Sequence, residues 1–182
     1  MVGVSKFMFA MITLIGQVCS ILGVIVYEMW LKEVEVRTVL FWNVILGIIG
    51  AFLNYSFAMR WNLACGISDY AFIIFTDVVF GAITTAFSTL PVMALFAKIT
   101  PKRVEGTVFA FLTGTANLDQ GVLQPMMGAW INYQFVGVTK DDQSGYPTLC
   151  LITLILAPIG FALILLIPKK ADIDKANEER DL

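Results

Sequence analysis

The sequence predicts an all-α integral membrane protein, and three observations carry this prediction. Hydrophobic residues make up 58% of the 182 residues and charged residues only 14%, whereas soluble domains carry about 45–50% and roughly 25%. Nine of the 26 charged residues lie in the last 14 positions, which leaves too few to cover a water-facing surface. Five apolar stretches are each long enough to cross a bilayer, for which about 20 helical residues suffice.

These stretches must be helices, because lipid cannot satisfy an open backbone and no alternating strand pattern appears. The positions of proline agree with this division into helices. Pro101 and Pro168 each follow a span, and Pro147 suits a first helical turn. The predicted spans form one domain over residues 1–168, followed by a solvated charged tail over 169–182. The five spans run over about 5–27, 38–59, 67–97, 104–133 and 147–167.

The composition excludes several functional classes. The chain has no histidine, which removes the commonest general base and metal ligand. Its three cysteines, Cys19, Cys65 and Cys150, are far apart and form no CxxC motif. We therefore expect no metal site, no cofactor and no enzyme activity. The net charge of −2 gives no basic footprint for nucleic acid.

Basic residues predict the orientation. With five spans, one side of the membrane carries Lys6, Arg60 and Lys140, and the other carries nine basic residues, including Arg37 and Lys98. The positive-inside rule places the C-terminus on the cytoplasmic side, or on the matrix or stromal side of an organelle.

Two acids, Asp77 and Asp119, fall inside predicted spans, and such acids are costly in a membrane and suggest function. The third span carries a polar stripe with Asp69 on roughly the same side. This face either lines a cavity or packs small residues against a neighbouring helix. The stripe consists of Asp77, Gly81, Thr84, Thr85 and Ser88.

The fourth span is the most polar of the five. Gly114, Gly121 and Gly128 repeat every seven residues, which predicts a seam where two helix backbones approach closely. Asn117 lies near this seam and either binds a ligand or bonds to a neighbouring helix.

The turn before the fourth span is basic and is followed by an acid. Lys102 and Arg103 precede Glu105, which falls in the first helical turn and meets the positive end of the helix dipole. We expect these residues to form a topology anchor and interhelix latch.

Several of these residues together resemble the signature of folate–biopterin transporters, a family of the major facilitator superfamily. The resembling pattern comprises Leu90-Pro91, Leu95, Pro101, the run from Glu105 to Leu112 and Asn117-Leu118. Tyr27 with Arg37, and the series Asn62, Gly66, Ile67, Asp69 and Phe72, also agree. The chain departs where the family usually has Cys-Pro and Met-Pro, here Thr100-Pro101 and Leu90-Pro91, and at Asp119, where a small residue is usual.

The resemblance implies twelve spans in two halves, of which this chain resembles helices eight to twelve. Substrates of such carriers bind between the halves, so this part alone would lack an opposing wall. It would move, or once have moved, a folate- or pterin-like organic anion, with Asp69, Asp77, Asn117 and Asp119 as candidate binding residues. The alternative is a non-transporting accessory subunit of a larger, for example organellar, membrane complex. Both readings imply a lipid bilayer and a further membrane chain as partners.

Overall fold

The computed structural model describes residues 6–100, 104–173 and 175 of the chain, and these residues are helical with short connections and no strand. Four described helices are long and apolar enough to cross a membrane. They run over Ala10–Leu31, Val36–Ala58, Asp69–Ile99 and Tyr146–Ile164. The all-α membrane class is therefore confirmed, whereas the count of five spans is not.

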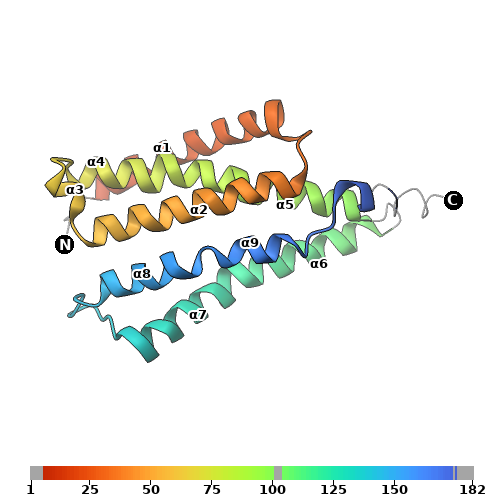
Figure 1. The fold of residues 1–182 in the computed structure, drawn as a ribbon. Helices are drawn as coiled ribbons and strands as arrows, with labels where there is room; N and C mark the ends of the chain where they lie inside the picture. The colour runs from red at the N-terminus through yellow and green to blue at the C-terminus, as the bar shows by residue number, and fades with distance from the viewer. Residues whose placement is uncertain (1–5, 101–103, 174, 176–182) are drawn as a thin grey trace.

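The first two long helices are α1 (Lys6–Val26), which continues as the π-helical turn η1 (Tyr27–Leu31), and α2 (Val36–Ala58). The short α3 (Trp61–Ala64) then leads into a continuous third rod. This rod consists of α4 (Asp69–Ile73), the π-helical η2 (Ile74–Phe80) and α5 (Gly81–Ile99). The rod occupies the centre of the packing, because α5 lies against both α1 and α2 (Figure 1).

The region predicted as the fourth span is a helical rod of four successive parts. They are α6 (Glu105–Leu118), the π-helical η3 (Asp119–Leu123), α7 (Gln124–Ile131) and the π-helical η4 (Asn132–Val136). Its amides, carboxylate and glycines explain why it does not meet the apolarity of a spanning helix, although its length is sufficient.

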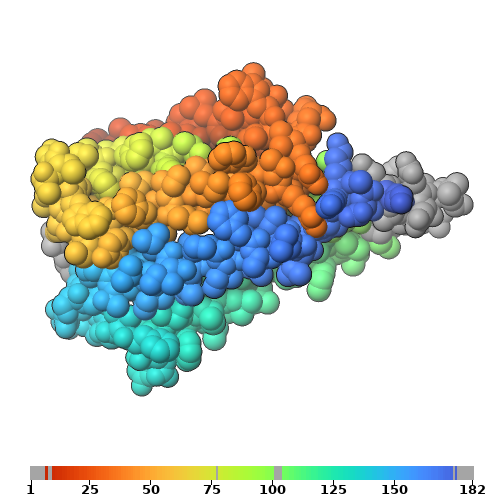
Figure 2. All heavy atoms as spheres, in the orientation of Figure 1, coloured from red at the N-terminus to blue at the C-terminus, as the bar shows by residue number. Residues whose placement is uncertain are grey.

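The last rod is broken at its centre into α8 (Tyr146–Leu156) and α9 (Ile159–Ile164). Pro158 lies at the break, where a proline inside a helix removes a backbone hydrogen bond. Both helices pack against α2, and Figure 2 shows this blue segment lying along the orange α2. Beyond it, residues 170–173 form a helical turn whose Ile173 is buried, so the predicted tail is not solvated at this position.

Two glycines allow long helices to approach closely. A Cβ added to Gly23 would lie 2.9 Å from the Cβ of Ala86, which marks the tight crossing of α1 and α5. A Cβ added to Gly160 would lie 2.8 Å from a methyl carbon of Val44, at the crossing of α9 and α2. Helices in lipid are not driven together by the hydrophobic effect. Small residues at these positions let the two backbones approach closely, so that van der Waals packing holds the helices together.

Candidate functional site

A cavity of about 360 Å³ lies between α1 and the η2–α5 rod. Its polar lining comes from Gln17, Thr13 and Ser20 on α1 and from Thr85 on α5. Gly81 leaves room on the rod side, because it carries no side chain. Small-molecule sites typically measure about 300–1,000 Å³, and this cavity, which is open on one side, falls within that range.

A second cavity, of about 420 Å³, lies on the other side of the same rod, between α2, η2–α5 and α8. Its polar lining comes from Asn54 on α2, Thr76 and Thr84 on the rod, and Thr153 on α8. Gly81 also lines this cavity, so it borders both of them. The threonine hydroxyls bond to carbonyls of their own helices, as Thr84 does to Gly81 at 2.9 Å.

The predicted polar stripe on the third span therefore borders cavities at Gly81, Thr84 and Thr85. Asp77 lies one helical turn before Gly81, within the π-helical η2. Its side chain lies outside the described residues. π-Helical turns are rare and are frequently found at functional sites. The backbone around Asp77 is therefore of a kind typical of such sites.

Asp69 lies at the start of α4 and is held in a cluster of hydrogen bonds. One carboxylate oxygen accepts from the Asn62 amide at 2.8 Å and the other from the Arg60 guanidinium at 2.7 Å. Asn62 is only 2% exposed and also donates to the Ile67 carbonyl. Because both oxygens of Asp69 are engaged, its observed role is to fix the turn between α3 and α4.

Asn117 and Asp119 lie on the fourth rod, where both side chains are exposed. No residue of α6, η3, α7 or η4 is buried. Within this rod the amide of Gln124 donates to Asp119 at 2.8 Å, across the π-helical turn. The structure thus does not bring Asn117 or Asp119 to the cavities beside α5.

The predicted glycine seam meets no other helix within the described chain. A Cβ added to Gly114, Gly121 or Gly128 would find no neighbouring atom within 4 Å. Close packing at this seam stays a prediction, and it requires a helix that is not among the described ones.

The predicted latch is described only in part. Lys102 and Arg103 lie outside the described residues, and Glu105 lies in the first turn of α6 as expected. The structure instead shows a latch at Arg37, whose guanidinium donates to the carbonyls of Ile167 and Leu165 beyond α9. These contacts tie the start of α2 to the end of the last helix.

Sequence reasoning did not select Gln17 or Asn54 as site residues. Both are amides inside apolar helices, and this is the signal that marks them as costly in lipid. Only the packing of α1 and α2 against the central rod shows that each faces a cavity.

Known proteins are similar to this chain over most of its length. The model of the BT1 family matches residues 1–182. The probable folate-biopterin transporter 6 of Arabidopsis thaliana is 30% identical over 160 residues, which are 88% of this chain and 31% of that protein. The folate-biopterin transporter of Synechocystis sp. is 26% identical over 170 residues, which are 92% of this chain and 34% of that protein.

A third relative carries an organelle in its name. The probable folate-biopterin transporter 9, chloroplastic, of Arabidopsis thaliana is 28% identical over 155 residues, 85% of this chain and 28% of that protein. No solved structure matches the chain. The chain spans about a third of the length of these curated relatives. The chain belongs to the BT1 family.

Proposed function

We propose that this chain forms part of a secondary carrier for a folate- or pterin-like organic anion, with the cavity between α1 and η2–α5 on the substrate path. The observation that carries the proposal is the lining of that cavity. An amide and three hydroxyls line this cavity between two membrane helices, next to the helical turn that holds Asp77. Polar groups at this depth mark substrate paths in transporters.

The chemistry of the lining suits a pterin ring. Gln17 offers both a donor and an acceptor, and the hydroxyls of Thr13, Ser20 and Thr85 offer further acceptors. A carboxylate accepts through two oxygens, so Asp77 matches the adjacent N–H donors of a pterin. The names of the relatives agree with this substrate class.

Further helices must complete the carrier. Substrates of such transporters bind between two helical repeats that rock against each other. The exposed polar rod from Glu105 to Val136 supports this requirement, because Asn117, Asp119 and Gln124 would be costly against lipid. We propose that the remaining helices, in the same polypeptide or in a second chain, cover this rod.

The uptake of radiolabelled folate or pterin into membrane vesicles tests the proposal. We expect Asp77→Asn and Gln17→Leu to reduce uptake by about tenfold or more, since one lost hydrogen bond to a charged group is worth about 1.5–3 kcal/mol. Asp141→Asn makes the same charge change in the exposed connection before α8 and should leave uptake unchanged. Wild-type uptake by Gln17→Leu would remove this cavity from the mechanism, and wild-type uptake with unchanged pH dependence by Asp77→Asn would remove Asp77.

The accessory-subunit alternative is favoured by the same exposed rod, since a partner other than a transporter half would also shield it. Purification in mild detergent separates the two. A stoichiometric assembly with unrelated subunits, without uptake, would favour the accessory role. Association with transporter helices would support the carrier.

For orientation, we propose that the end bearing Arg37, Lys98 and Lys170 faces the cytoplasm, or the matrix or stroma. These residues gather at one end of the bundle, as their contacts show, whereas Arg60 lies at the other end, beside Asp69. Labelling of a C-terminal tag in sealed membranes tests this. We expect a reagent added outside the sealed membranes to label the tag only after the membranes are permeabilised.

A further inference from the structure

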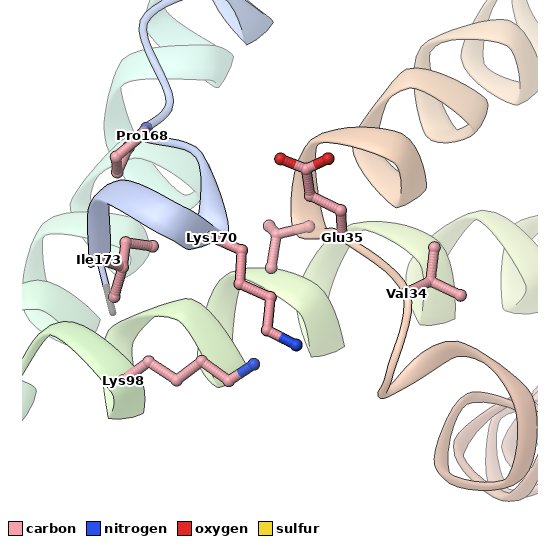
Figure 3. Close-up of a pocket in the computed structure, with 7 residues that line it drawn as sticks. Val34, Glu35, Lys98, Pro168, Lys170 and Ile173 are labelled. Atoms are coloured by element: carbon pink, nitrogen blue, oxygen red, sulfur yellow. The ribbon is translucent and has the colours of Figure 1, made fainter. Parts of the chain in front are cut away.

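A small pocket lies at the basic end of the molecule, where three separate segments meet (Figure 3). The connection between the first two long helices contributes Val34 and Glu35, and the last turn of α5 contributes Lys98. The segment after the final helix contributes Lys170 and Ile173. Ile173 is buried, with 8% of its surface exposed, so it anchors this segment against the helices.

The two lysines form a basic pair across this pocket. In Figure 3 their ammonium groups point to the same side of the pocket, and the Glu35 carboxylate points away from them. Lys170 forms no ion pair with a carboxylate of the described residues. Two positive charges from different segments therefore share one mouth, which favours an anion that bridges them.

The position of the pocket in the membrane indicates the kind of anion. Lys98 lies at the end of a membrane-spanning helix, and Lys170 lies a few residues beyond the last one. Both ammonium groups should thus lie at the level of lipid headgroups. Val34 and Ile99 are exposed apolar side chains at the same end, and they offer a surface to acyl chains.

We propose that the Lys98–Lys170 pair binds the phosphate of an anionic phospholipid. The cavity itself holds about 10 Å³, roughly the space of one water molecule, so the phosphate would lie over its mouth rather than inside. Basic pockets between membrane helices on the inner side are a recurring setting for anionic lipid headgroups. The bound lipid would join the connection before α2, the end of α5 and the segment after α9. This proposal does not depend on transport.

Native mass spectrometry of the purified full chain tests the proposal, with phosphatidylglycerol and phosphatidylcholine of the same acyl chains as probes. We expect preferential retention of phosphatidylglycerol. The double variant Lys98→Gln/Lys170→Gln should weaken its binding roughly 30-fold, since each lysine near an anionic surface is worth roughly fivefold. The control Lys32→Gln/Lys140→Gln makes the same charge change outside the pocket and should bind like the wild type.

Two further arms make the result decisive. Glu35→Gln removes a negative charge from the pocket lining and should tighten phosphatidylglycerol binding, an effect that a folding defect cannot produce. Millimolar inorganic phosphate should fail to displace the lipid. Equal retention of both lipids, wild-type binding by the pocket double variant, or full displacement by inorganic phosphate would overturn the assignment.

Discussion

Arg37 joins two segments that are far apart in the sequence. It lies in the first turn of α2, and its guanidinium donates to the carbonyls of Leu165 and Ile167, some 130 residues later. Carbonyls at the end of a helix have no partner within the helix, and a cation there also meets the negative end of the helix dipole. One side chain therefore provides both a cap and an interhelix contact.

We expect Arg37→Met to lower the free energy of unfolding by about 1–2 kcal/mol, somewhat less than two buried charged hydrogen bonds would give, because the site is partly exposed. Thermal unfolding in detergent measures this. Lys32→Met is the matched control, since that exposed ammonium pairs with Glu28 one turn away, and it should change the unfolding temperature less. Equal effects would show that Arg37 does not act as a latch.

Asn62 holds the turn between α3 and α4 in a cluster of hydrogen bonds. It is almost completely buried and donates to Asp69 and to the Ile67 carbonyl. Arg60, in the left-handed region at φ 62°, completes the cluster from the preceding turn. The sequence predicted Asp69 as a pathway acid, because spacing alone placed it on the face of Asp77.

We expect Asn62→Ala to destabilise the chain by about 1–3 kcal/mol, since it removes the donor to the part-buried Ile67 carbonyl and to one oxygen of the Asp69 carboxylate. Asn54→Ala removes the same atoms from an exposed position and should be nearly neutral in unfolding. Denaturation of both variants in the same detergent checks the difference. A loss at Asn54 equal to that at Asn62 would contradict the structural role of the cluster.

At the scale of elements, the sequence predicted the long apolar helices well, because length and apolarity are properties of the local sequence. It predicted the fourth span less well, since this rod is helical but too polar for a spanning helix on its own. The π-helical turns at Ile74–Phe80 and Asp119–Leu123 could not be predicted, because hydropathy does not distinguish one helical winding from another.

The positions at which helices cross could not be predicted from the sequence either. The seven-residue glycine repeat predicted a seam at Gly114, Gly121 and Gly128, whereas close approaches are observed at other glycines, including Gly23 and Gly160. A glycine permits another helix to approach closely, but which helix packs against it depends on how all the helices are arranged. The sequence left open whether the polar stripe lines a cavity or packs against a helix, and Gly81, Thr84 and Thr85 of this stripe line cavities. That the amides Gln17 and Asn54 also line them became visible only with α1 and α2 in place.

A pair of glycine variants tests this packing. Gly23→Leu should destabilise the chain by about 1–3 kcal/mol, because the new side chain meets Ala86 in a tight crossing. Gly114→Ala should be neutral or stabilising by up to about 1 kcal/mol in the isolated chain, since alanine favours helix more than glycine. Unfolding of the isolated chain gives both values. Destabilisation by Gly114→Ala would show that a neighbour already occupies the seam.

At the scale of the molecule, four apolar rods contrast with one polar rod. The region from Glu105 to Val136 has no buried residue, although it carries three amides and two carboxylates in its first 20 residues. Lipid would not stabilise such a surface. The chain also spans about a third of its curated relatives. Further helices that cover this rod in the functional protein would explain both the exposed polar surface and the difference in length.

The most direct test is to identify what lies over the glycine seam in native membranes. A photo-crosslinking residue at Gly121, with one at Phe7 on an exposed apolar surface as the control, followed by mild purification and mass measurement, gives the answer. The account predicts a crosslink from Gly121 to further transporter helices, in the same polypeptide or in a second chain, and uptake by the resulting assembly. A lone 20.1 kDa species that transports without any such contact would contradict it.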